Sequence, residues 1–187
     1  MKIFVVDNFD SFTFNLIHIL EEFATEVHVK RNNQINLKIL EEFDKIVFSP
    51  GPGLPSEIKI MYDIIHCFKN TKPILGVCLG HQAIAHYFGA QLINMKEVNH
   101  GREKPTQIIQ SDYIFKNIPA EFNSGRYHSW IVDKNNLPSM LEITSVDSKN
   151  HIMSIKHKEY DIRGLQFHPE SIMTKYGFEI LKNWVMH

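Results

Sequence analysis

Short apolar runs that alternate with segments of helical periodicity constrain the fold of this chain more than any other feature. Such runs occur in the first half at Ile3–Val6, Ile46–Phe48 and Ile74–Val77, and Val27–Val29 is interpreted as a further strand. Continuous apolar runs of this length are typical of strands covered on both faces. Strands that alternate with helices form right-handed crossovers and a parallel sheet. The first half therefore predicts an α/β fold with an open, mostly parallel sheet flanked by helices.

The helices between and after these runs are predicted from periodicity and from residues suited to their ends. The first predicted helix follows a cap at Asp10 or Ser11 and runs to Phe23, and the second is Leu37–Phe43, capped by Asn36. The third begins after a cap at Ser56 and runs to about Phe68, and the fourth is Gly80–Phe88, ended by a left-handed Gly89. The last is Thr174–Val185, whose inward-facing residues are predicted to be Phe178, Leu181, Trp184 and Val185.

The second half has a different pattern, because helical periodicity fades between Ala90 and Phe167. Short apolar runs suggest strands at Gln107–Ile109, Leu141–Thr144, Ile152–Ile155 and Gly164–Phe167, several of them antiparallel. No repeat or long linker divides the chain. We therefore expect both halves to share one sheet and residues 1–187 to form a single domain.

Composition excludes several classes of protein. Across 187 residues, 20 Lys and Arg face 21 Asp and Glu, so there is no large basic field for nucleic acid or an anionic membrane. No run of about eighteen apolar residues is present, so nothing is expected to span a bilayer. The two cysteines, Cys67 and Cys78, exclude a disulfide framework. They favour a reducing, cytoplasmic location.

Cys78 is the strongest candidate for a catalytic residue. It lies in Gly76-Val77-Cys78-Leu79-Gly80, between a predicted strand and a predicted helix. A nucleophile on such a turn is exposed at the carboxyl edge of the sheet, and the helix N-terminus favours its thiolate. The two glycines would relieve crowding in the turn. The alternative is a buried structural cysteine, which is the interpretation we favour for Cys67.

A base for this nucleophile is predicted just after the last predicted strand, in Gln166-Phe167-His168-Pro169-Glu170. In extended backbone, residues two apart point the same way, so Glu170 can accept a hydrogen bond from His168. Pro169 restricts His168 to extended geometry. Such a pair could serve Cys78 as acid, base and orienting group. A capped turn before the last helix is the alternative.

Two further segments are candidates for binding. The loop Ser49–Gly53 could expose N–H donors to an oxyanion, with Gly53 next to Cys78, although a plain connecting turn has the same composition. Arg126–Trp130 combines polar donors with two aromatic side chains, which suits either a binding strand or a half-buried edge. A metal site that includes Cys78 and His81 is disfavoured, because no second Cys/His pair has the required spacing.

Five segments together give a specific resemblance. The sequence resembles the class I glutamine amidotransferases with a Cys-His-Glu triad, and within them the small subunits of anthranilate synthase and aminodeoxychorismate synthase. The matching segments, in the order of the family, are Asp7–Thr13, Ser49–Gly53, Gly76–Gln82, Arg126–Ser129 and Gln166–Ser171. They cover nearly the whole chain, and Asp7–Thr13 points to the chorismate-using members. The resemblance implies a flavodoxin-like amidotransferase fold.

The resemblance also implies roles for matching residues. Cys78 would attack the glutamine carboxamide, and His168, oriented by Glu170, would protonate the departing ammonia. The implied oxyanion hole is the backbone N–H of Gly53 and Leu79. The implied glutamine-binding residues are Gly51, Pro52, Gly53, Gln82, Ser129 and Trp130. Trp130 departs from the family, which more often has a small aliphatic residue there.

The implied partners are L-glutamine and a chorismate-binding synthase large subunit, in a heterodimer or heterotetramer, with no nucleic acid and no membrane. No cofactor is expected in this chain, and Mg²⁺ is expected in the partner. Anthranilate synthase is preferred over aminodeoxychorismate synthase. A stand-alone cysteine hydrolase is a second hypothesis, weakened because Leu79 rather than His follows Cys78. A catalytically dead binding module is a third, weakened by the intact Cys78, His168 and Glu170.

Overall fold

In the part of the chain that the structure describes, nine strands form one sheet, which has a parallel and an antiparallel half. The computed structural model describes residues 1–95 and 101–187. The strands are β1 Lys2–Asp7, β2 Glu26–Arg31, β3 Lys45–Phe48, β4 Ile74–Val77, β5 Leu92–Asn94, β6 Arg102–Ile108, β7 Glu121–Arg126, β8 Trp130–Val132, β9 Leu141–Val146, β10 Ile152–His157 and β11 Ile162–Leu165. The α-helices are α1 Thr13–Glu21, α2 Lys59–Phe68, α3 Leu79–Tyr87 and α4 Gly177–Met186.

The strand order of the main sheet is β2-β1-β3-β4-β11-β10-β9-β6-β7. In this spatial order, the first five strands, β2 through β11, pair in parallel, and β11 and the strands after it, through β7, pair antiparallel. β5 and β8 form a separate two-stranded sheet. The prediction that both halves of the chain share a sheet is confirmed, and β11 is the strand that joins them.

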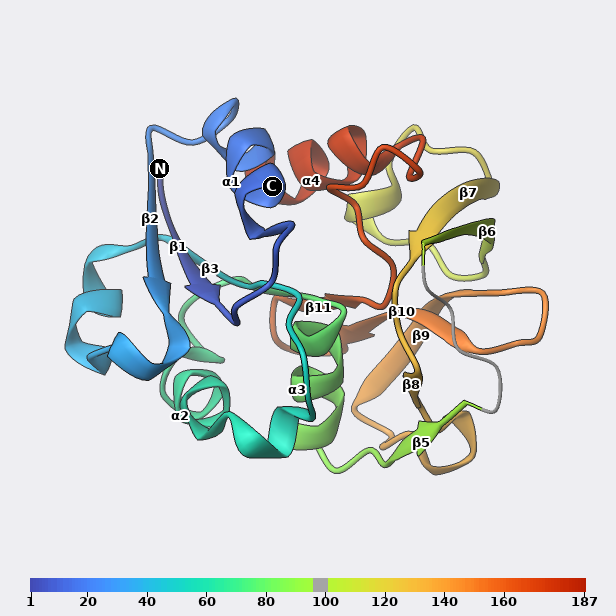
Figure 1. The fold of residues 1–187 in the computed structure, drawn as a ribbon, viewed down its shortest axis with the longest axis horizontal. Coiled ribbons are helices and arrows are strands. Elements are labelled where there is room, and N and C mark those ends of the chain that lie inside the picture. Colours follow the sequence, from blue (N-terminus) through green and yellow to red (C-terminus); the bar gives the residue numbers. More distant parts are fainter. Residues whose placement is uncertain (96–100) are drawn as a thin grey trace.

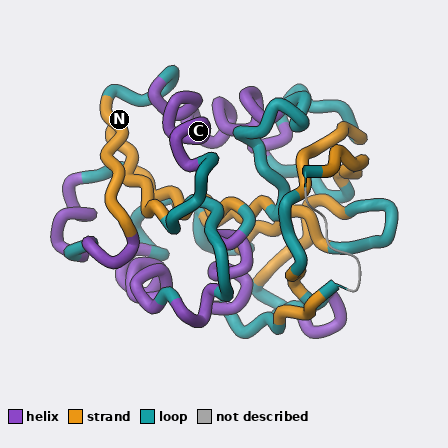
Figure 2. Tube along the Cα trace, in the orientation of Figure 1, coloured by secondary structure: helices purple, strands orange, loops and turns teal. Residues whose placement is uncertain are grey.

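Helices cover both faces of the parallel half (Figure 1). α1 and α4 lie together on one face, and α2 and α3 lie on the other; the tube view shows the strands running between these two helical layers (Figure 2). The side chains of β1 alternate accordingly, with Ile3 and Val5 in the α1/α4 core and Phe4 and Val6 in the α2/α3 core. All four are fully buried, which explains why this strand is a continuous apolar run in the sequence.

Two of the predicted N-caps are wrong and one is confirmed, and Gly89 has the predicted left-handed conformation after α3, with a φ of 101°. Asn36 accepts a hydrogen bond from the Lys38 N–H, as predicted, but the segment that it caps, Leu37–Glu42, is a 3₁₀-helix. α1 begins at Thr13 with Phe12 as its N-cap, because Asp10 accepts the Phe12 N–H in the preceding turn. Ser56 lies within a 3₁₀ turn started by Pro55, so α2 begins only at Lys59.

The start of the last helix also differs from prediction, because Thr174 is used elsewhere. Its hydroxyl donates to the His168 carbonyl and accepts from the Gly125 N–H, so α4 starts only at Gly177. Phe178, predicted to face inward, is 45% exposed and packs edge-on against the Phe23 ring. Among the described residues, none of the helices is both long and apolar enough to cross a membrane.

Cys67, which we interpreted as a buried structural residue, is exposed. Its neighbours Ile64, Ile65 and Phe68 point into the core of the α2/α3 face. The helical period of α2 therefore leaves Cys67 on the solvent side. Both cysteines of the chain are free thiols.

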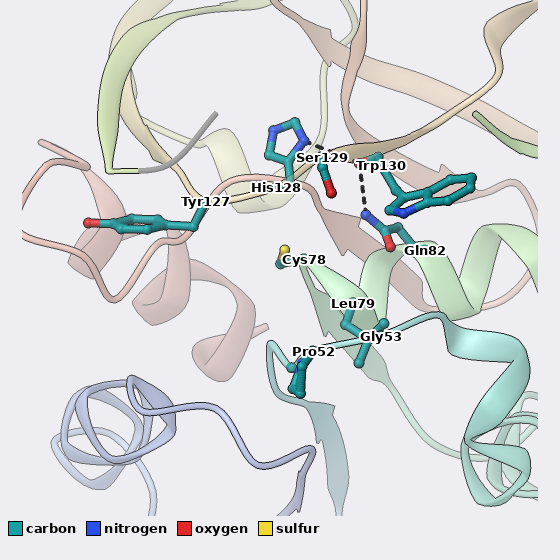
Figure 3. Close-up of a pocket in the computed structure, with 10 residues that line it drawn as sticks. Pro52, Gly53, Cys78, Leu79, Gln82, Tyr127, His128, Ser129 and Trp130 are labelled. Carbon is teal, nitrogen blue, oxygen red and sulfur yellow. Dashed lines mark hydrogen bonds between the residues drawn. The ribbon is translucent and has the colours of Figure 1, made fainter. Parts of the chain in front are cut away.

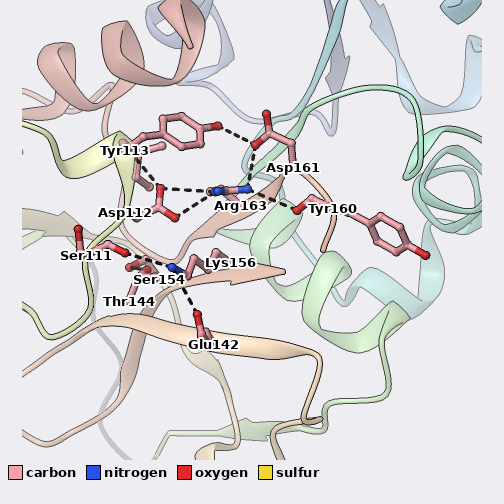
Figure 4. Close-up of polar contacts among 11 residues, drawn as sticks. Ser111, Asp112, Tyr113, Glu142, Thr144, Ser154, Lys156, Tyr160, Asp161 and Arg163 are labelled. Atoms are coloured by element: carbon pink, nitrogen blue, oxygen red, sulfur yellow. Dashed lines mark hydrogen bonds and ion pairs between the residues drawn. The ribbon is translucent and has the colours of Figure 1, made fainter. Parts of the chain in front are cut away.

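An ion-pair cluster ties the antiparallel half to the start of β11 (Figure 4). Arg163 of β11 pairs with Asp112 at 3.2 Å and with Asp161 at 2.8 Å. The Tyr113 hydroxyl donates to Asp161, and the Arg163 guanidinium lies over the Tyr113 ring. Burial, followed by the charge of Asp161, raises the pKa of Tyr113. This cluster anchors the amino end of the strand whose other end continues into the candidate site.

His81 of α3 is fully buried against β11. A Cβ added to Gly164 would lie 2.6 Å from the His81 Nδ1, so the helix packs here directly on the strand backbone. Burial lowers the pKa of His81 to about 3. The folded protein therefore holds this histidine neutral in a position where the unfolded chain would take up a proton near pH 6.5.

This difference predicts acid sensitivity. Because the pKa of His81 is lower in the folded than in the unfolded state, stability falls as pH decreases through 6.5, by roughly 2 kcal/mol between pH 7 and pH 5. Urea unfolding followed by tryptophan fluorescence at both pH values measures this slope. His81→Gln should have a shallower slope, whereas His18→Gln, at an exposed position, should keep it. Equal slopes in all three proteins would contradict the prediction.

Candidate active site

Cys78 sits in a strained turn between β4 and α3, which we call the elbow. Its φ of 51° and ψ of −100° are rare for a residue with a side chain. The turn is tight: a Cβ on Gly76 would lie 2.4 Å from the carbonyl carbon of Gly80, and one on Gly80 would lie 2.6 Å from the Cβ of Phe48. The two glycines thus relieve crowding, as the sequence predicted, and the elbow projects the Cys78 side chain at the carboxyl edge of the sheet.

The pairing of β4 with β11 brings the histidine to this edge. The Cys78 N–H donates to the Leu165 carbonyl at 2.7 Å, so the residues that follow β11 emerge beside the cysteine. The His168 N–H then donates to the Gly125 carbonyl at 3.1 Å. These backbone contacts fix His168 between the parallel half of the sheet and β7.

His168 and Glu170 form a buried pair. The Nδ1 of His168 lies 2.7 Å from the Oε1 of Glu170, and the two side chains are 3% and 0% exposed. Burial by itself would lower the pKa of His168, but the negative charges of Cys78 and Glu170 outweigh it and hold the pKa well above its usual value. The ring of Tyr127 packs edge-on against His168 at 4.9 Å. The arrangement therefore favours a protonated imidazole beside the sulfur of Cys78.

The loop after β3 is held rigidly in front of Cys78. The Asn8 side chain donates to the Ser49 carbonyl at 2.9 Å, and the Asn8 N–H donates to the Ser49 hydroxyl. A Cβ on Gly51 would lie 2.5 Å from the Asn8 carbonyl oxygen. At the first position of α3, the Leu79 N–H has no acceptor within its helix. Gly53 of this loop and Leu79 of α3 line the same pocket as Cys78.

A pocket of about 160 Å³ opens over the cysteine (Figure 3). One water needs roughly 10–15 Å³, so the pocket can hold a small metabolite. In Figure 3, the Pro52–Gly53 loop and Leu79 lie on one side of Cys78, and Ser129, Trp130 and Gln82 lie on the other. The lining residues are Gly51, Pro52, Gly53, Cys78, Leu79, Gln82, Tyr127, His128, Ser129 and Trp130.

Hydrogen bonds lock the far wall of the pocket. The Nε2 of Gln82 donates to the Trp130 carbonyl at 2.9 Å and to the Oε1 of Gln166 at 3.2 Å. The same Trp130 carbonyl lies 3.2 Å from the Nδ1 of His128, which must therefore be the donor. Burial and the charge of Arg126 lower the pKa of His128 to about 3. His128 is thus neutral, with a bare Nε2 lone pair.

A family model described as glutamine amidotransferase class-I matches residues 4–187. The chain belongs to this family. It is therefore an amidotransferase, and the resemblance inferred from the five segments is confirmed.

Curated relatives match over nearly the full length of this amidotransferase. It is 42% identical to the anthranilate synthase component 2 of Pyropia yezoensis, with 98% of each chain covered. It is also 42% identical to the aminodeoxychorismate/anthranilate synthase component 2 of Bacillus subtilis (strain 168), covering 98% of this chain and 95% of the relative. A solved structure from Thermoplasma acidophilum, described as one of the subunits of GMP synthase, superposes with a TM-score of 0.90 at 28% identity, covering 100% of this chain and 92% of the other.

Sequence reasoning found most of this pocket but missed three of its neighbours. Tyr127 and His128 were assigned only to a segment of uncertain role, yet both line the pocket. Gln166 was noted only as part of a motif, although its side-chain amide reaches the sulfur of Cys78. The signal that could have pointed to Gln166 was its position two residues before His168, on the same side of an extended backbone. Among the described residues, no group of three or more His, Cys, Asp and Glu side chains is arranged to hold a metal ion.

The tight packing of the elbow predicts that this amidotransferase is destabilised by a side chain at Gly80. Gly80→Ala should lower the free energy of unfolding by about 1–3 kcal/mol, because the new Cβ would overlap the Phe48 backbone and side chain. Urea unfolding of the variant measures the loss. His86→Ala, at the exposed end of the same helix, should change stability by less than about 1 kcal/mol. An undiminished stability of Gly80→Ala would mean that the strand and helix can separate without cost.

Proposed function

We propose that this amidotransferase hydrolyses L-glutamine on Cys78 and delivers ammonia to a chorismate-using synthase, as component 2 of anthranilate synthase. The observation that carries the glutaminase reaction is the buried pair of His168 and Glu170, 2.7 Å apart, with Cys78 close enough for its charge to raise the pKa of the imidazole. The name of the Pyropia yezoensis relative supports the choice of complex.

In the first step, the Cys78 thiolate attacks the side-chain carbonyl carbon of glutamine. The developing oxyanion accepts hydrogen bonds from the backbone N–H groups of Gly53 and Leu79. The imidazolium of His168 gives its proton to the departing nitrogen, so ammonia leaves and a glutamyl thioester remains. Glu170 keeps the ring oriented and stabilises its positive charge.

In the second step, water replaces ammonia. Neutral His168 removes a proton from the water as its oxygen attacks the thioester carbonyl. Collapse of the tetrahedral intermediate regenerates the Cys78 thiolate beside the protonated imidazole and releases glutamate, whose new carboxyl group loses its proton to solvent. The ion pair that began the cycle is thus restored without any other reactant.

The pocket suits glutamine as substrate. The side chain of Gln82 already donates to Trp130 and Gln166, so its Oε1 serves as an acceptor for the substrate's α-ammonium. Ser129 and Trp130 line the same space, and a main-chain contact to the substrate would tolerate the tryptophan side chain. We assign glutamine binding to Gly51, Pro52, Gly53, Gln82, Ser129 and Trp130, which all line the pocket.

The partner follows from the fate of the product. Near neutral pH, free ammonia in water becomes mostly ammonium, which is not a nucleophile, so a sealed route into a docked synthase has a chemical purpose. The thiolate and the imidazole provide the nucleophile, the acid and the base of the glutaminase reaction, so we assign no metal or cofactor to this chain. We assign Mg²⁺ to the partner. A nucleophile that must stay reduced fits a cytoplasmic location.

Aminodeoxychorismate synthase is the second candidate complex. The Bacillus subtilis relative, also 42% identical, carries both activities in its name, so one chain of this kind can serve either partner. Reconstitution with each candidate large subunit, supplied with chorismate and glutamine, distinguishes them. The ortho amino product, anthranilate, supports our assignment, and exclusive formation of the para amino product overturns it.

Cys78→Ser should abolish glutamine-dependent product formation in the reconstituted complex, because the serine hydroxyl is not ionised near neutral pH. High ammonium salt should still support the reaction, since it bypasses the thioester. Cys67→Ser, at the exposed cysteine, should behave as the unmodified protein with both nitrogen sources. Equal loss with glutamine and ammonium in an assembled Cys78→Ser complex would contradict the assigned role.

Glu170→Gln should reduce glutamine turnover by roughly tenfold or more, because His168 loses the carboxylate that orients it. Loss of that charge also lowers the pKa of His168, so the alkaline limb of the rate profile should move to lower pH. Steady-state glutaminase assays across pH measure both effects. Glu179→Gln, exposed on α4, is the matched control. An unaltered profile in Glu170→Gln would reduce Glu170 to a turn residue.

A further inference from the structure

The amide of Gln166 bridges the nucleophile and the substrate pocket. This residue follows β11 directly, and its side chain is fully buried. Its Nε2 donates to the Sγ of Cys78 at 3.7 Å, and its Oε1 accepts from the Nε2 of Gln82 at 3.2 Å. Gln82 in turn donates to the Trp130 carbonyl. A chain of hydrogen bonds therefore runs from the pocket wall at β8 through two amides to the reactive sulfur.

Each contact has a distinct physical effect. An N–H group directed at a thiolate stabilises its negative charge and restricts the rotamer of the cysteine side chain. Because the amide is neutral, it stabilises the thiolate without adding a charge that would act on His168 or Glu170. The acceptor end of the same amide fixes which way the Gln82 carboxamide points, since both N–H bonds of Gln82 are then engaged.

An apolar side chain of similar size would fill the same space but supply neither contact. The volume of Gln166 alone therefore does not account for its place in the structure. A buried amide is costly unless its polar atoms are paired, and here the partners are the nucleophile and a residue that lines the pocket.

We propose that Gln166 is a positioning residue that holds the Cys78 thiolate ready for attack and, through Gln82, sets the orientation of the glutamine-binding wall. The second half of this statement rests on the proposed function, because it requires glutamine in the pocket. The first half concerns the sulfur alone and can be tested without substrate.

Gln166→Glu is the most informative variant. It preserves shape and can still accept from Gln82, but it replaces the donor facing Cys78 with a carboxylate that repels the thiolate. The pH midpoint for alkylation of Cys78 by iodoacetamide should rise by at least about one unit. Peptide mass spectrometry measures both cysteines of one sample, so exposed Cys67 is an internal control whose midpoint should not move.

Gln166→Met removes both contacts at similar volume. Its alkylation midpoint should rise less than that of Gln166→Glu, because no charge is added. In the reconstituted complex, its kcat/KM for glutamine should fall roughly tenfold to hundredfold, with an increase in KM because Gln82 is no longer held. Ammonium-dependent synthesis should stay unchanged, which shows that the complex is assembled.

The outcomes separate the two proposals. If both variants fold, as judged by circular dichroism, and their Cys78 midpoints equal that of the unmodified protein, the positioning role is overturned. If Gln166→Glu does not fold, an unchanged Cys78 midpoint in Gln166→Met overturns it equally. If the midpoints shift while the unmodified protein fails to hydrolyse glutamine with any partner, the contact to the sulfur is supported and the proposed function fails.

Discussion

The parallel pairing of β4 with β11 is the contact on which the site depends. The hydrogen bond from the Cys78 N–H to the Leu165 carbonyl, 2.7 Å long, joins segments that are distant along the chain. Because parallel strands end at one edge, it aligns the elbow of Cys78 with the segment that carries His168. The ion-pair cluster around Arg163 secures the other end of β11. A shift of this pairing by one residue would turn each side chain to the opposite face.

Three buried histidines near this edge hold two charge states, and their surroundings account for both. His168 faces the negative charges of Cys78 and Glu170, which raise its pKa despite burial. His128 lies near the cation Arg126, and His81 packs on the backbone of β11, so burial keeps both neutral. The site therefore concentrates positive charge on one imidazole, next to the sulfur that has to be ionised.

Local patterns predicted those parts of the site that depend on neighbours in sequence. Gly76 and Gly80 indicated the elbow, and the spacing of His168 and Glu170 indicated their contact. Capping predictions failed where a side chain formed another bond, as Thr174 does with the His168 carbonyl. Strands β5, β7 and β8 were missed, because β5 and β8 have only three residues each and the sequence of β7, EFNSGR, shows no apolar alternation.

The sequence by itself determined the α/β class, the positions of the first four strands along the chain and the elbow at Cys78, because periodicity and glycine spacing are local properties of the chain. Only the tertiary structure decided which distant groups meet at the sulfur. The donation of Gln166 to Cys78, the exposure of Cys67 and the neutral state of His128 all arise from packing between strands and helices. Pairing and burial depend on the whole sheet, so no short segment encodes them.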